Sequence, residues 1–321
     1  MARGPLYQAD YRPLFSGHET FPLRYGWLKK GYDAIEESGS DNGNKAIFLN
    51  DGAIAKFGVG KNMVGSIRHW ATSCGVIRGA PGSDRLEVTS LGRLLLGTEG
   101  IDPYLEHPGS LWLMHWNLCS GENPRGLKTT WFWAFNHFTG VMFRREDLVD
   151  GLMRFAEARG WPRASRTTVQ RDVECFVRTY ESRPAGHRGT AEDSLESALS
   201  ELGLIRGLRG QFQFVRGPKR SLPNEVFVVA LNSFWNSLGA AGTLSFEAIA
   251  HEPGSPGRVF LLDEGDLADR LLTMDEVTAG VLRWSETAGL KQALRKRALT
   301  DDEKFALLLR FYRKQHAEVV A

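Results

Sequence analysis

The segment at residues 53–70 constrains the fold of this chain more than any other. Two short helical patterns flank a turn at Gly58 and Gly60, where glycine supplies the backbone freedom that a tight turn needs. Apolar residues at helical spacing face a core, which leaves the polar positions outward. This pattern is typical of a helix-turn-helix, whose second helix can enter the DNA major groove. The side chains expected to meet DNA are Lys61, Asn62, Ser66, Arg68 and His69.

Two short strands follow, at residues 76–78 and 85–89, around a turn rich in glycine and proline. They predict a β-hairpin directly after the second helix, which is the layout of a winged helix at about 46–96. Arg85 lies in this hairpin and is a further candidate for contact with DNA. Because modules of this layout also serve as dimerisation or docking units, a homodimer and a protein-binding role both remain open.

Composition indicates a globular chain that folds around its own core. Hydrophobic residues make up 42% and charged residues 24% of the 321 residues. No apolar run approaches the roughly 20 residues of a membrane helix, and the N-terminus lacks the apolar core of a signal peptide. The 3 cysteines fit reduced thiols in a cytoplasmic protein better than a disulfide framework.

The expected architecture is mainly α with small β-hairpins (α+β), with winged helix-turn-helix modules in a multi-helical body. The length predicts two domains. Residues 1–145 would hold the first winged helix and an aromatic helical core, and residues 146–321 an arginine-rich helical domain. A basic hairpin after about residue 204 would form a second wing, within about 195–216.

The net charge is only +2, so any nucleic-acid footprint must be local. Arginine, which grips phosphate through paired N–H donors, is concentrated at residues 154–188 and 205–220. Solvated surface charge is the alternative explanation for any single cluster. The cluster residues taken as DNA-binding candidates are Arg166, Arg206, Arg209 and Arg216.

Several short blocks stand in consistent order, at 15–31, 58–64, 67–70, 103–105, 111–116, 171–175, 192–195 and 201–205. In these blocks the chain resembles the SspB family, the nicking components of single-strand DNA phosphorothioation systems. That family belongs to an uncharacterised domain family encoded beside PAPS-reductase-like enzymes. The C-terminal third carries no such block.

The resemblance implies a role in bacterial anti-phage defence, in which sulfur replaces a non-bridging phosphate oxygen of DNA and this component cuts one strand. It also implies sulfur-transfer partners, namely a cysteine desulfurase, an ATP pyrophosphatase and an ATPase. It transfers no catalytic residue set. Most nucleases use carboxylate-bound divalent metals, so Mg²⁺ or Mn²⁺ is the cofactor to consider. No nucleotide or redox cofactor is expected, because residues 58–62 lack the glycine spacing of a phosphate loop.

The candidate catalytic residues fall into two pairs. His18 and Glu19 could act as base and metal ligand, although Glu19 could instead cap a helix that begins near Phe21. Asp172 and Glu174 lie two apart on a predicted helix, so they project to different sides and at most one faces a site. A further pair at residues 192–193 fits a helix cap better.

Two functions remain in competition. The first is a sequence-selective nicking endonuclease that acts on double-stranded DNA together with sulfur-transfer partners. The second is a non-catalytic winged-helix DNA-recognition subunit or transcription regulator, which the lack of a known nuclease motif favours. Conversion of supercoiled plasmid to open circle separates them.

Overall fold

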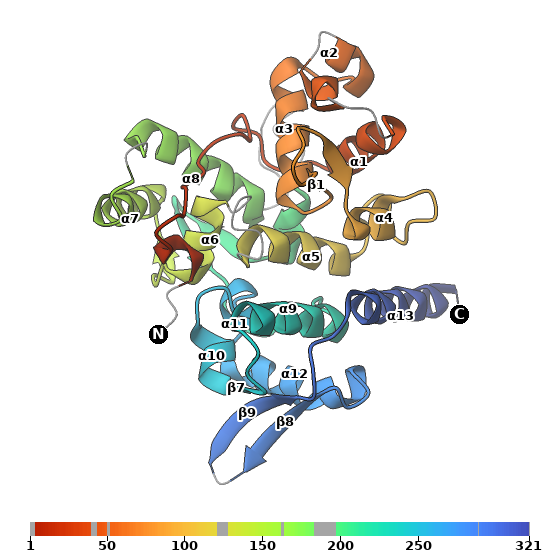
Figure 1. The fold of residues 1–321 in the computed structure, drawn as a ribbon. Helices are drawn as coiled ribbons and strands as arrows, with labels where there is room; N and C mark the ends of the chain where they lie inside the picture. The colour runs from red at the N-terminus through yellow and green to blue at the C-terminus, as the bar shows by residue number, and fades with distance from the viewer. Residues whose placement is uncertain are drawn as a thin grey trace.

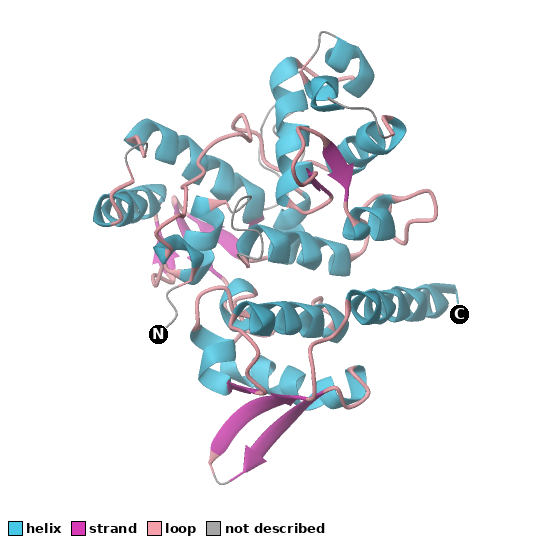
Figure 2. Ribbon diagram, in the orientation of Figure 1, coloured by secondary structure: helices cyan, strands magenta, loops and turns pink. Residues whose placement is uncertain are grey.

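The computed structural model describes residues 4–39, 44–49, 52–120, 128–161, 164–182, 197–287 and 289–320. Helices make up most of the described chain, and short strands form sheets at three places (Figures 1 and 2). The expectation of a mainly α chain with small β-hairpins is therefore confirmed. None of the helices in the described ranges combines the length and the apolar character that a membrane span requires.

The elements expected at residues 46–96 are present in the expected order. They are α2 (Gly52–Phe57), α3 (Lys61–Ser73), the antiparallel pair β1 (Ile77–Gly79) and β2 (Leu86–Val88), and α4 (Ser90–Leu96). A short 3-10 helix, Asn44–Phe48, precedes them. Gly58 turns the chain between α2 and α3 with a φ of 63°, a left-handed conformation that glycine adopts without strain.

The first α-helix begins later than the sequence suggests. After a 3-10 turn at Pro5–Tyr7 the chain is irregular, and α1 runs over Trp27–Glu37. Gly26, directly before it, has a φ of 76° and therefore cannot continue a helix from Phe21. Glu19 accordingly does not cap a helix.

Two strongly aromatic helices lie in the core. They are α5 (Pro108–Cys119) and α6 (Thr129–Asn136), and every residue of α6 is buried. His115 of α5 has no exposed surface, and burial lowers the pKa of its imidazole to about 4, so it stays neutral at pH 7. The expectation of an aromatic helical core is confirmed, and His115 lies inside it.

A four-stranded sheet forms beside these helices, in the order β3-β6-β5-β4. The hairpin of β5 and β6 confirms the one expected after residue 204, and β3, which precedes residue 145, pairs with β6 beyond it. The Ser165 hydroxyl caps α8 by accepting from the Thr168 N–H at 3.2 Å. The elements are β3 (Met142–Phe143), α7 (Arg145–Ala158), α8 (Arg166–Tyr180), β4 (Glu181–Ser182), a 3-10 helix at Ala198–Leu202, β5 (Ile205–Leu208) and β6 (Gln211–Phe214).

The C-terminal part packs below α5 in Figure 1. Its elements are α9 (Asn224–Ser237), β7 (Thr243–Ser245), α10 (Phe246–His251), α11 (Pro256–Val259), α12 (Glu264–Val277), β8 (Leu282–Thr287), β9 (Leu290–Arg295) and α13 (Asp301–Val320). Its sheet has the order β7-β9-β8. The same arrangement occurs in the four-stranded sheet. There β3 precedes a set of helices and pairs with β6, the last strand of the following hairpin, just as β7 pairs with β9 here.

Candidate nucleic-acid interface

Residues 15–21, here called the bridging segment, lie between α3 and α8 (Figure 1). On the α3 side, Ser66 Oγ donates to the His18 carbonyl at 2.7 Å, and Trp70 Nε1 donates to the Phe21 carbonyl at 3.0 Å. On the α8 side, Arg178 Nη1 donates to the Thr20 carbonyl at 3.3 Å. The segment therefore joins two helices that are about a hundred residues apart in the sequence.

The carboxylate of Asp172, on α8, anchors the bridging segment. It accepts hydrogen bonds from the Ser16 N–H at 2.8 Å and from His18 Nε2 at 2.7 Å, and also from the Thr130 hydroxyl. The Thr20 N–H donates to His18 Nδ1 at 3.0 Å. Since Nδ1 is an acceptor, the His18 proton sits on Nε2 and is donated to Asp172.

Backbone strain is concentrated in the bridging segment. Ser16, Glu19 and Thr20 have φ values of 71°, 46° and 66°, a left-handed region that side-chain-bearing residues rarely occupy. Gly17, with a φ of 93°, also approaches His69 so closely that a Cβ would lie 2.7 Å from its Nδ1. Such strain persists only where surrounding contacts impose it, and the bonds to Asp172 and Ser66 are those contacts.

Buried basic groups surround the Asp172 carboxylate. Lys128 is 6% exposed, and burial lowers the pKa of its ammonium to about 8, with the charge of Asp172 acting in the opposite direction. Burial, together with the charges of Lys128, His18 and Arg68, holds the pKa of His69 well below its usual range. His69 Nε2 is buried without a hydrogen-bond partner. The imidazole of His69 is therefore neutral at pH 7.

The structure brings together only part of the predicted catalytic set. His18 and Asp172 are bonded and buried, whereas Glu19 and Glu174 are exposed, Glu174 on the opposite side of α8 from Asp172. The expectation that only one of the two α8 acids points inward agrees with this placement. The pair at residues 192–193 lies outside the described residues.

This arrangement does not fit a divalent metal at Asp172. Both carboxylate oxygens already accept hydrogen bonds, and His18 uses both ring nitrogens. Metal ions need ligand lone pairs that are free to coordinate. In the described ranges, no group of three or more His, Cys, Asp and Glu side chains is arranged to hold a metal. The hydrogen bonds of the buried pair clamp the bridging segment against α8.

Two of the α3 residues expected to meet DNA are not placed to do so. Ser66 has no exposed surface and His69 turns its ring into the protein, because the bridging segment covers this side of α3. The sequence prediction that they face outward is wrong, since helical spacing cannot reveal a cover supplied by a remote segment. Lys61 and Asn62 are exposed, and Arg68 is half-buried.

The exposed face of α8 carries the side chains best suited to DNA. Gln170 and Arg171 are exposed there, and Arg166 at the start of the helix is half-exposed and paired with Asp150 at 2.8 Å. Arg171 lies in the arginine-rich stretch at 154–188, but neither it nor Gln170 is among the residues predicted from the sequence to bind DNA. Val169 and Val173, four residues apart, mark the buried face of the helix. On a repeat of 3.6 residues, positions 170 and 171 then face away from the core, which the sequence alone can indicate.

The remaining arginine candidates differ in exposure. Arg206 and Arg209 are exposed on the β5–β6 hairpin. Arg216 Nη1 donates to the Leu262 carbonyl at 3.2 Å, which holds the side chain against the C-terminal part. Arg85 is half-buried in the β1–β2 hairpin.

We expect the Lys128 ammonium to make stability pH-dependent. Its pKa falls from 10.5 in the unfolded chain to about 8, so between these values the unfolded state binds more protons and stability rises with pH. Lys128→Met removes the titrating group. Across that pH range the free energy of unfolding of the wild type should therefore rise by about 3 kcal/mol more than that of the variant. Urea unfolding at several pH values measures it, with Lys61→Met as the exposed control. Parallel pH profiles of wild type and Lys128→Met would contradict the prediction.

Comparisons with known proteins relate the chain to one family. The model described as "Protein of unknown function (DUF4007)" matches residues 15–312. The structure is similar to the "Magnesium ion-bound SspB crystal structure", with a TM-score of 0.82 and 29% identity over 97% of this chain and 90% of that chain. A second SspB crystal structure matches with a TM-score of 0.81 and 30% identity over 95% and 90%. No curated protein matches the sequence.

Proposed function

Because the chain belongs to the DUF4007 family and shares its fold with SspB, we propose that it is a DNA-binding, strand-nicking protein of a bacterial DNA phosphorothioation system. The match extends through the C-terminal third, where the sequence alone offered no recognisable block. In this proposal the chain acts on double-stranded DNA beside sulfur-transfer partners: a cysteine desulfurase, an ATP pyrophosphatase and an ATPase.

The observation that carries the DNA-binding part is the pairing of α3 and α8 through the bridging segment. Each helix follows another helix in the sequence and precedes a β-hairpin, which we interpret as the winged-helix layout. Lys61 and Asn62 on α3 and Gln170 and Arg171 on α8 then supply phosphate and base-edge contacts. Arg206 on the β5–β6 hairpin adds a further phosphate contact.

The C-terminal part repeats this layout with α12 and the sheet β7-β9-β8, but it is unsuited to binding DNA. Its α12 occupies the position of α8 but exposes carboxylates at Glu264, Asp269, Asp275 and Glu276. A negative helix face is repelled by the phosphate backbone. We therefore assign DNA contact to α3 and α8 and their hairpins, and not to α12.

Plasmid nicking tests the catalytic part of the proposal. Purified protein incubated with supercoiled plasmid and Mg²⁺ or Mn²⁺ should produce open circles, and chelation with EDTA should stop the reaction. Linear products would indicate cutting of both strands and so contradict a nickase. The matched control is Arg171→Glu, which should lose nicking together with DNA binding.

A non-catalytic DNA-recognition subunit is the second candidate. The environment of Asp172 favours it, because the one buried acid of the predicted catalytic set already accepts three hydrogen bonds from the protein, which occupy most of its acceptor sites. Salt-sensitive duplex binding without nicks under any metal condition would select this function.

A further inference from the structure

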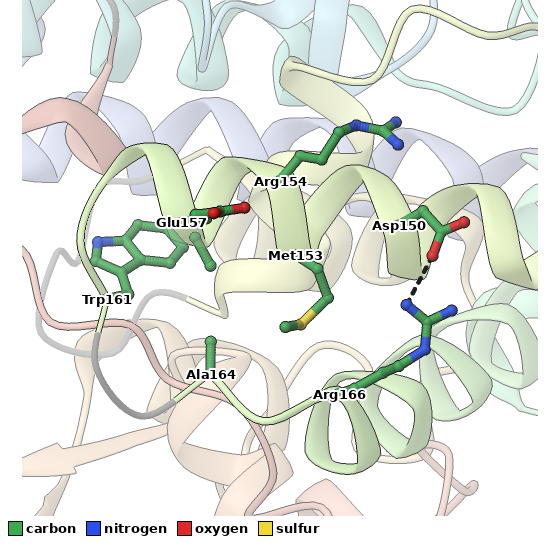
Figure 3. Close-up of a pocket in the computed structure, with 8 residues that line it drawn as sticks. Asp150, Met153, Arg154, Glu157, Trp161, Ala164 and Arg166 are labelled. Atoms are coloured by element: carbon green, nitrogen blue, oxygen red, sulfur yellow. Dashed lines mark ion pairs between the residues drawn. The ribbon is translucent and has the colours of Figure 1, made fainter.

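A cavity of about 410 Å³ is lined by α7, by Trp161 and Ala164, and by Arg166 at the start of α8 (Figure 3). Trp161 stands at one end, and the ion pair of Arg166 and Asp150 closes the other. Met153 and Ala164 lie between these ends. The volume falls within the roughly 300–1,000 Å³ of small-molecule sites, so the cavity has room for one nucleotide-sized group.

Trp161 offers a fixed aromatic surface to this cavity. Its ring packs against Phe155 with a centroid distance of 5.4 Å and against Tyr11 at 5.5 Å, which limits its rotation. A rigid indole is a stacking platform for a flat ring. The thioether of Met153 adapts its shape to such a ring from the neighbouring wall.

Polar groups at both ends fit the rest of a nucleotide. The carboxylate of Glu157, beside Trp161, can accept from ring N–H or amino groups of a base. The guanidinium of Arg166 is paired with Asp150 through Nη1, and its remaining N–H groups suit a phosphate oxygen. Glu157 and Asp150 stand at opposite ends and so cannot share one metal ion. An aromatic ring, a carboxylate and a guanidinium in one cavity suit a nucleobase with its backbone phosphate better than they suit a metal ion.

We propose that this cavity accepts a nucleobase turned out of a DNA duplex bound along α8. The inference rests on the proposed function, because the duplex must first lie on α8. Arg166 belongs to both the cavity and that helix, so a backbone held there passes the cavity mouth. Stacking on Trp161 and hydrogen bonding to Glu157 offset the lost pairing, which costs least at a mismatch.

The test compares the affinity of the full chain for two short duplexes of one sequence, one fully paired and one with a central T·T mismatch. Fluorescence anisotropy should show the mismatched duplex bound about 10-fold more tightly. Trp161→Ala should abolish the preference and Trp161→Phe should keep it. Because Trp161→Ala also removes packing, Ala164→Phe provides a second variant that fills the cavity and leaves the aromatic cluster intact.

The outcomes separate this inference from the proposed function. Equal binding of both duplexes by wild type, or a mismatch preference that survives Ala164→Phe, would overturn the inference while DNA binding stands. Binding to neither duplex would contradict the proposed function and this inference with it. Loss of the preference in Ala164→Phe, with paired-duplex affinity unchanged, is the result we expect.

Discussion

Replacing Asp172 with alanine should lower the free energy of unfolding by about 3–5 kcal/mol, because three donors, two of them in buried bonds, lose a charged acceptor and each buried donor left unsatisfied costs about 1–3 kcal/mol. The carboxylate is 2% exposed and is bonded to Ser16, His18 and Thr130. Its removal leaves these donors buried without an acceptor, and it takes away the contacts that hold the strained backbone of the bridging segment. Urea denaturation at pH 7 measures the loss.

Glu174→Ala is the matched control for this prediction. Glu174 lies two residues further along the same helix, carries the same charge and is exposed, so its removal should change stability by less than about 0.5 kcal/mol. Equal effects of the two variants would show that the clamp is not the anchor of the bridging segment. The substitution Asp172→Asn, which keeps the shape but not the charge, should fall between them.

Reversing the charge of Arg171 should weaken duplex binding by about 10- to 100-fold, because a phosphate contact becomes a repulsion. Arg171 is exposed on α8, so the change should leave the fold and its stability intact. Arg313→Glu makes the same change of charge on α13, on the opposite side of the molecule from α8 (Figure 1). A comparable loss in Arg313→Glu would place the effect in overall charge rather than in the α8 surface.

Local patterns predicted the local structure well. The glycine turn before Lys61, the hairpin after residue 204 and the buried aromatic helices all depend on residues within a few positions of one another, and each is confirmed. The largely apolar run at 258–262 is of a length typical of a strand, yet the chain forms a short helix there, Pro256–Val259, which Ser255 caps. Apolar runs of this length do not distinguish strand from helix.

Contacts between residues far apart in the chain could not be predicted from the sequence. His18 and Asp172 were both suspected, but nothing in their spacing revealed that they bond to each other across more than 150 residues. The bridging segment also covers Ser66, so this side chain is buried and does not face outward as predicted. Nothing in the sequence indicates that the strand order beside α8 recurs beside α12, because the exposed face of α8 is basic and that of α12 is acidic. The topology is repeated, but the surface chemistry is not.

The salt dependence of duplex binding tests the central claim, that the joined α3 and α8 surface meets the DNA backbone. Binding constants of wild type and Arg171→Glu are measured by anisotropy over a range of salt concentrations. We predict that log K falls steeply with log salt for wild type, and that the slope becomes shallower by about 1 or more in the variant. A wild-type slope near zero, or identical slopes for the two proteins, would contradict the account.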